Sequence, residues 1–347
     1  MRRESVVGWD LGGAHLKAAR LGGSGTVENV VQIPCPLWQG LPHLHAALEQ
    51  AAEALGRTTL HGLTMTGEMV DLFPDRAQGV TRLVGEIRQR LPDAELLVYA
   101  GSSGFVDSGQ AADAAERIAS ANWLASATLV ASRVEAALFI DIGSTTTDLA
   151  VVQGGTVRMV GQGDSDRLLA GELLYTGVVR TPVMALAEEV PFSGAWVPVM
   201  AEYFASAADV HRLTGRLPQG ADELPAADGG EKTVTASARR LARMIGRDLD
   251  SAPPAAWRRL GEWLARAQAR RIEDACDRLL SRGELPDDAP VVGAGVGRFI
   301  AEEFAGRRNR PYLDFGRLLP EGGVGRERIS DCAPAVAVAW LAQRTGA

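Results

Sequence analysis

Two short acidic turns carry the clearest chemistry in this sequence. One reads DLGGAHLK from Asp10 to Lys17, and the other reads DIGSTTTD from Asp141 to Asp148. Each follows an apolar run, and glycine in such a turn permits positive φ and lets backbone N–H groups bind an anion. Hydroxyl side chains would add hydrogen-bond donors. We therefore expect two phosphate-binding turns formed by Gly12, Gly13, Lys17, Gly143, Ser144, Thr145 and Thr146.

The acids of these turns predict a magnesium site. Mg²⁺ usually takes one or two carboxylates together with water and phosphate oxygens. Asp10, Asp141 and Asp148 are the candidate ligands, although Asp148 has the alternative role of capping a turn. Lys17 would meet a phosphate as a point charge, or it would lie solvated on its strand.

The two turns open two similar halves of the chain. Apolar runs at 6–11 and 137–143 end in an acid, and each precedes two further strands joined by a glycine turn. This duplication predicts an α/β protein with two lobes around a cleft. The first lobe is expected at 1–134 with the C-terminal helix 331–347. The second is expected at 135–330, with a helix over 171–190 and a mostly helical insertion at about 192–285.

A third glycine-rich turn lies at 291–298, where VVGAGVGR separates an expected strand from an expected helix. Such a junction can receive a phosphate, a ribose or a base. One GxGxG is weak by itself, but three glycine turns in this order are more specific. Gly293, Gly295 and Gly297 are therefore candidates for binding an organic part of a ligand.

Composition excludes several classes of function. The chain has 347 residues and a formal net charge of -7, which argues against nucleic-acid binding because phosphate backbones require a basic face. No apolar run approaches the roughly 18 residues of a membrane span, and no secretory signal is expected at the N-terminus. Three widely spaced cysteines suggest reduced thiols in a cytoplasmic protein. The oligomeric state, including a homo-oligomer, stays open.

The three turns resemble those of the superfamily of actin, Hsp70 chaperones and sugar kinases. The matching segments are DLGGAHLK, DIGSTTTD and VGAGVG. The hydantoinase/oxoprolinase branch looks most similar, because its second motif resembles DxGGTxTD. The resemblance implies a duplicated ribonuclease-H-like fold with a central cleft.

Longer segments resemble the tetrahydromethanopterin-linked C1-transfer pathway proteins of methylotrophs and methanogens. The resemblance spans almost the whole chain, and its segments include WDLGGAHLKAAR, PCPLWQGL, TMTGEMVDLFPDR and GELLYTGVVRTPVMALA. It implies an Mg²⁺-dependent transferase of methanofuran or methylofuran biosynthesis. That enzyme joins an aminomethyl-furanmethanol diphosphate to the phenol of a tyramine-glutamate and releases pyrophosphate. Whether the phenol belongs to tyramine, tyrosine or a glutamylated derivative stays open.

The reaction that the resemblance implies requires a proton acceptor and substrate-binding side chains. A carboxylate must accept the proton of a phenol whose ordinary pKa is about 10, and Asp10, Glu68 and Glu172 are the candidates. Lys17 would neutralise the leaving group. The anionic glutamyl end should meet a basic side chain. The remaining substrate-binding candidates are His15, Tyr175, Arg180, Arg239, Arg240 and Arg243.

Two other functions fit the same sequence. One is an ATP-dependent kinase or a hydantoinase-type hydrolase, and the other is a non-catalytic nucleotide-binding switch protein. Fold alone does not choose among them. They differ from the transferase in requiring ATP, which the transferase would not consume.

Overall fold

The computed structural model describes residues 4–320 and 322–345, and its first sheet lies in the N-terminal half of the chain. Strand β1 pairs antiparallel with β2 and parallel with β4, so the apolar run that ends at Asp10 lies in the middle of the sheet. The strand order is β3 (Val27–Pro34), β2 (His15–Leu21), β1 (Val6–Leu11), β4 (Leu60–Met65), β5 (Glu95–Tyr99) and β6 (Phe105–Asp107).

The second sheet repeats this topology. Strand β7 pairs antiparallel with β8 and parallel with β13, as β1 does with β2 and β4. The order is β10 (Leu173–Leu174), β8 (Thr147–Gln153), β7 (Ala136–Ile142), β13 (Val291–Ala294) and β14 (Tyr312–Asp314), and β9 (Thr156–Arg158) also pairs with β8. The predicted duplication and the ribonuclease-H-like fold of each half are therefore confirmed.

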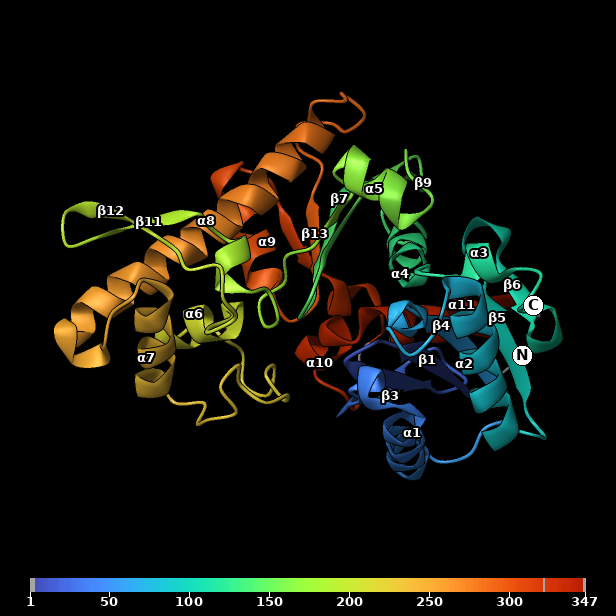
Figure 1. The fold of residues 1–347 in the computed structure, drawn as a ribbon. Coiled ribbons are helices and arrows are strands. Elements are labelled where there is room, and N and C mark those ends of the chain that lie inside the picture. The colour runs from blue at the N-terminus through green and yellow to red at the C-terminus, as the bar shows by residue number, and fades with distance from the viewer. Residues whose placement is uncertain (1–3, 321, 346–347) are drawn as a thin grey trace.

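Two alanine-rich helices, α4 and α11, lie between the sheets and share one core with both (Figure 1). Helix α11 packs against β1 and β4 because both strands carry a glycine there. A Cβ on Gly8 would lie 2.1 Å from the Ala335 carbonyl oxygen, and one on Gly62 would lie 2.9 Å from that of Val338. The helices outside the insertion are α1 (Leu41–Leu55), α2 (Arg76–Arg90), α3 (Ala115–Ile118), α4 (Asn122–Ala131), α5 (Asp164–Ala170), α9 (Arg298–Arg307), α10 (Arg326–Asp331) and α11 (Ala333–Thr345).

The insertion forms its own core around Trp257, which stacks on Phe192. It projects from the second lobe on the side away from α2 and α3 (Figure 1). It is less helical than the sequence predicts, because a hairpin precedes its first helix and loops separate its helices. Its elements are β11 (Glu189–Phe192), β12 (Ala195–Pro198), α6 (Ala207–Leu213), α7 (Val234–Met244), the 3-10 turn η6 (Leu249–Ser251) and α8 (Pro254–Leu280). Short 3-10 turns elsewhere are η1 (Leu37–Gln39), η2 (Gly67–Met69), η3 (Gly101–Ser103), η4 (Ser108–Gln110), η5 (Val183–Ala185) and η7 (Phe315–Leu318).

The prediction of a helix over 171–190 is wrong. That stretch contains β10, an extended loop, the turn η5 and the start of β11. Gly171 adopts a left-handed conformation, and Pro182 lacks a backbone donor. The loop also presses against the second acidic turn, since a Cβ on Gly177 would lie 2.4 Å from the Ser144 carbonyl carbon. Packing against that turn, rather than helical periodicity, determines the path of this segment.

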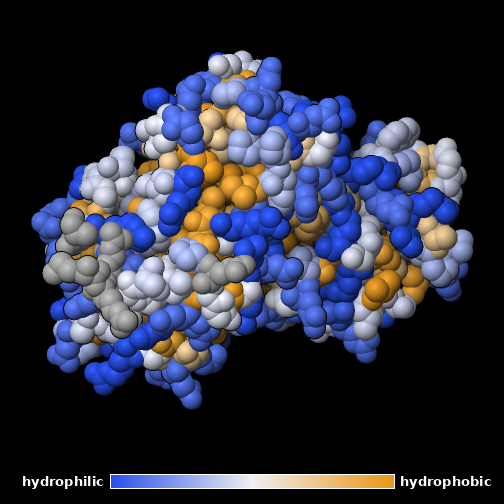
Figure 2. Space-filling model, turned by 180° about the vertical axis from the view of Figure 1, so that it is seen from behind, coloured by the Kyte–Doolittle hydropathy of each residue, from blue (hydrophilic) through white to orange (hydrophobic). Residues whose placement is uncertain are grey.

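The surface agrees with the acidic, charge-rich composition. Seen from behind, hydrophilic side chains cover most of one face, and an apolar area lies near its middle (Figure 2). In the part of the chain that the structure describes, no helix is both long and apolar enough to span a membrane.

Candidate active site

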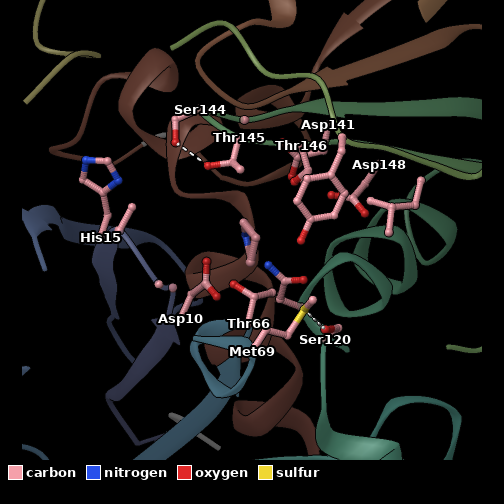
Figure 3. A pocket seen from close by; sticks show the side chains of 18 of the residues that line it. Asp10, His15, Thr66, Met69, Ser120, Asp141, Ser144, Thr145, Thr146 and Asp148 are labelled. Atoms are coloured by element: carbon pink, nitrogen blue, oxygen red, sulfur yellow. Dashed lines mark hydrogen bonds between the residues drawn. The ribbon is translucent and has the colours of Figure 1, made fainter. Parts of the chain in front are cut away.

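A cavity of about 370 Å³ lies between the two lobes, where the two acidic turns face one another (Figure 3). Its size is within the usual range for a small-molecule site, roughly 300–1,000 Å³. The predicted site residues that line it are Asp10, Gly12, Gly13, His15, Lys17, Asp141, Gly143, Ser144, Thr145, Thr146, Asp148, Tyr175 and Arg180.

The two turns have the same backbone geometry. In the first, the Gly12 N–H donates to the His15 carbonyl oxygen at 3.0 Å, and in the second the Gly143 N–H donates to that of Thr146 at 2.9 Å. Each turn joins two antiparallel strands of its sheet. The hairpins therefore hold the leading acids, Asp10 and Asp141, at equivalent places in the two lobes.

The prediction that the turn glycines have positive φ is wrong. Gly12, Gly13 and Gly143 are not among the described residues with positive φ. Gly12 is required for a different reason, because a Cβ there would lie 2.8 Å from the His15 carbonyl oxygen. Gly295, which touches the site, is left-handed at φ +77°, and a Cβ there would lie 2.5 Å from Asp141 Oδ1. The third glycine turn thus touches the second acidic turn directly.

Burial perturbs the acids of the cavity. It raises the pKa of Asp10 to about 6, against the lowering effect of the Lys17 ammonium. It raises the pKa of Asp141 to about 7, and the Asp148 carboxylate adds to that shift. Asp10 Oδ1 is buried without a hydrogen-bond partner. These two carboxyls therefore hold their negative charge most easily when a cation is near.

Two cations of the site, Lys17 and Arg167, have hydrogen-bond partners. The Lys17 ammonium donates to the Asp331 carbonyl oxygen at 2.7 Å. Burial alone would lower its pKa, but the acidic groups around it, Asp10 and Asp141 among them, raise it. Arg167 donates to Asp148 Oδ1 at 2.8 Å and stacks on Trp123. Asp148 is thus held in an ion pair.

Sequence reasoning missed several cavity residues, namely Thr66, Ser120, Asn122, Asp164 and Arg167. Ser120 connects two carboxylates, with its hydroxyl 2.9 Å from Glu68 Oε1 and 3.2 Å from Asp164 Oδ2. It does so from a left-handed backbone, at φ +52°. Asp164 also accepts from Arg76 at 2.8 Å. Of these residues, only Thr66 could have been identified from the local sequence, because it follows a strand that pairs parallel with β1.

Glu68 lies behind the cavity wall rather than in it. Its carboxyl is buried, Oε2 has no hydrogen-bond partner, and burial raises its pKa. It reaches the cavity through Ser120. Tyr175, by contrast, lies in the wall itself and is 49% exposed.

Glu172 is not brought to the cavity. Its carboxylate accepts from the backbone N–H groups of Val160 and Gly161 at 3.0 and 3.2 Å, and it pairs with Arg282 at 2.8 Å. This buried arrangement ties β10 to the neighbouring loop and to the end of α8. The structure therefore gives Glu172 a packing role.

The arginines of α7 also lie outside the cavity lining. Arg240 is fully buried and pairs with Asp209 and Asp228, whereas Arg243 contacts Asp228 at 3.7 Å. Arg239 is exposed. The glycines of the third turn are likewise used in packing, and neither Gly293, Gly295 nor Gly297 lines the cavity.

The carboxylates of the cavity suit a cation that also binds phosphate oxygens better than a cation coordinated by protein side chains alone. Among the described residues, no three His, Cys, Asp or Glu side chains are grouped to hold an ion. Mg²⁺ commonly takes only one or two carboxylates and keeps water and phosphate oxygens. Asp10, with its unpartnered oxygen, and Asp141 suit that mode. Asp148 does so less well because Arg167 already binds it.

Two ribonuclease-H-like halves around a cleft place this chain in the fold class of actin, Hsp70 chaperones and sugar kinases. A solved nucleotide-free acetone carboxylase has a TM-score of 0.59 at 11% identity, covering 98% of this chain and 70% of that one. The hydantoinase/oxoprolinase family model matches residues 59–312, and the chain belongs to that family.

Two curated relatives carry the same name, (4-{4-[2-(gamma-L-glutamylamino)ethyl]phenoxymethyl}furan-2-yl)methanamine synthase. The protein of Methanocaldococcus jannaschii is 25% identical over 340 residues, covering 98% of each chain. That of Methanococcus vannielii is 29% identical over 113 residues, which is 33% of this chain and 50% of the relative.

Proposed function

We propose that this protein is a transferase of methanofuran-type cofactor biosynthesis. It would join an aminomethyl-furanmethanol diphosphate to the phenol of a tyramine- or tyrosine-glutamate, with release of pyrophosphate. One combined observation supports the proposal. This chain is similar over 98% of its length to a synthase of such an ether, and both of its acidic turns line the same cavity.

The diphosphate would lie between the two turns. Ser144 and Thr145 line the cavity there, and Lys17 supplies a half-buried positive charge. When bound, Mg²⁺ held by Asp10 and Asp141 would screen the negative charge of the phosphate oxygens. Preorganised positive charge of this kind favours departure of an anionic leaving group.

The chemical step exchanges one carbon–oxygen bond for another. The bond from the furan methylene to the diphosphate oxygen breaks, and one from that methylene to the phenol oxygen forms. The phenol proton would pass to Asp164, which lines the cavity, and Ser120 would hand it on to Glu68. The raised pKa of Glu68 suits a group that holds a proton. Asp10 is the alternative acceptor.

The direct test is a reaction with both organic substrates and Mg²⁺, followed by measurement of pyrophosphate and of the ether by mass spectrometry. Pyrophosphate should appear only when both substrates are present. Asp141→Asn should reduce the rate by at least about 100-fold, whereas Asp166→Asn, at an exposed position on α5, should not. ATP consumption without ether formation would instead support the kinase, hydrolase or switch alternatives.

A further inference from the structure

Arg180 differs from the other cations of the cavity. Three cationic side chains line it, and two of them, Lys17 and Arg167, donate to protein oxygens. Within residues 4–320 and 322–345, the guanidinium of Arg180 forms no hydrogen bond or ion pair. It lies instead 4.8 Å from the centre of the Trp38 ring. Its donors are therefore available to a ligand.

The position of Arg180 is well defined by its surroundings. Its backbone N–H donates to the Ser144 carbonyl oxygen at 2.8 Å, which anchors it to the second acidic turn. Trp38 comes from the first lobe, so the stacked pair bridges the cleft. Burial lowers the pKa of Arg180, and a partly desolvated guanidinium gains most from a planar anion such as a carboxylate.

Lys17 and Arg180 both lower the pKa of His15, but the other groups near them differ. Lys17 lowers the pKa of Asp10 and Asp141, the acids of the two turns. Arg180 acts on His15 and is itself affected by two tyrosines, Tyr203 and Tyr175. The cavity thus has one cation beside the acids and a second one among aromatic side chains, an arrangement suited to two different anionic groups.

A carboxylate lies close to His15. Glu223, from the loop between α6 and α7, places Oε2 3.4 Å from His15 Nε2 and accepts from Gln32 Nε2 at 3.1 Å. Burial lowers the pKa of His15 to about 4, so its ring is neutral at ordinary pH. His15 Nε2 is buried and has no hydrogen-bond partner. A neutral ring with a free polar atom therefore lies near both a cation and an anion.

We propose that Arg180 and Glu223 bind the α-amino-acid end of the phenolic acceptor, with Arg180 taking its carboxylate and Glu223 its ammonium. Trp38 and His15 complete this subsite. The inference rests on the proposed transferase function, because the relatives' name contains a γ-glutamyl group, which keeps a free α-carboxylate and α-amine. Free tyrosine as the acceptor would present the same two groups, an α-carboxylate and an α-ammonium.

Steady-state kinetics with two acceptors test the subsite. γ-Glutamyltyramine has the amino-acid end, and tyramine lacks it. Arg180→Gln should raise KM for γ-glutamyltyramine by about 10- to 100-fold, the usual effect of losing a charged hydrogen bond, with KM for tyramine unchanged. Glu223→Gln should act in the same direction. The control is Arg259→Gln, at an exposed position on α8, which should leave both values unchanged.

An opposite pattern would overturn the inference. If Arg180→Gln raised KM for the furan diphosphate and left that for γ-glutamyltyramine unchanged, Arg180 would be a phosphate ligand. Equal increases for both acceptors would also contradict the subsite. Circular dichroism and urea unfolding of each variant establish that it folds.

Calorimetric binding of γ-glutamyltyramine separates this inference from the proposed function. Binding that depends on Arg180 in a protein that forms no ether would retain the subsite and refute the transferase. Ether formation with unchanged binding and KM in Arg180→Gln would retain the transferase and refute the subsite.

Discussion

Lys17 and Asp148 occupy equivalent positions in the two hairpins of the duplicated fold. Lys17 lies opposite Asp10 across β1 and β2, and Asp148 lies opposite Asp141 across β7 and β8. The duplication therefore places a cation in one lobe and a carboxylate in the other. The strand after the first turn thus carries a cation where the equivalent strand of the second lobe carries a carboxylate, which Arg167 neutralises.

Replacing Lys17 with glutamine should slow pyrophosphate release by about 100-fold or more, because the leaving group loses a half-buried, preorganised charge. The rate of the chemical step should be measured in single-turnover experiments with saturating acceptor. Arg259→Gln is the control, since Arg259 is exposed on α8. An unchanged rate in Lys17→Gln would remove Lys17 from the mechanism.

Gly295→Ala should impair both stability and activity. A left-handed alanine costs about 1 kcal/mol, and its Cβ would lie 2.5 Å from Asp141 Oδ1. Displacing a reacting group by about 1 Å commonly costs about 100-fold in rate. Activity and the free energy of unfolding in urea are the two measurements.

Gly283→Ala is the matched control for that substitution. Gly283 has a similar φ of +71°, but a Cβ there meets no atom within 4 Å. It should lose about 1 kcal/mol of stability from backbone strain and keep full activity. Equal losses of activity in the two variants would mean that the contact with Asp141 has no functional effect.

Replacing Ser120 with glycine should destabilise the protein less than replacing it with alanine. Both substitutions remove the hydroxyl that lies between Glu68 and Asp164, and leaving a buried carboxyl without its donor costs about 1–3 kcal/mol. Only glycine relieves the left-handed backbone at φ +52°, which is worth about 1 kcal/mol. Ser120→Gly should therefore unfold at higher urea than Ser120→Ala. The reverse order would contradict the strain.

Acid should destabilise the protein through its buried, neutral histidines. Burial lowers the pKa of His211 to about 4 from an ordinary 6.5, so the unfolded chain binds the proton more readily. The contribution to stability is complete above pH 6.5 and is lost as the pH falls to 4. Linkage sets it at about 3 kcal/mol.

His211→Gln tests this contribution. Glutamine can still donate to Gln268 Oε1, which accepts from His211 Nε2 at 2.8 Å, but it does not titrate. Urea unfolding at pH 7 and pH 4.5 should show a smaller loss of stability in the variant. His43→Gln, at an exposed histidine of α1, should lose as much stability as the wild type. An unaltered pH dependence in His211→Gln would refute the assignment.

Local sequence was enough to predict the strands, the duplication and the two acidic turns. Strand β1 occurs at the predicted range of 6–11, and β7 occurs within one residue of the predicted 137–143. Such signals are short-range, because a strand that ends in an acid and a glycine carries its turn with it. The leading aspartates could therefore be identified without knowledge of any distant contact.

The partners of charged side chains were decided only by tertiary structure. Arg240 and Arg180 are both candidates by sequence for binding an anionic substrate. Asp209 nevertheless neutralises Arg240, whereas no carboxylate of the described residues pairs with Arg180. Ser120 meets Asp164 across 44 residues of chain. Pairing of this kind depends on which distant segments fold together, and the free energy of a buried charge depends on that pairing. The sequence by itself thus determined where the chemistry begins, whereas folding decided which side chains remain available to perform it.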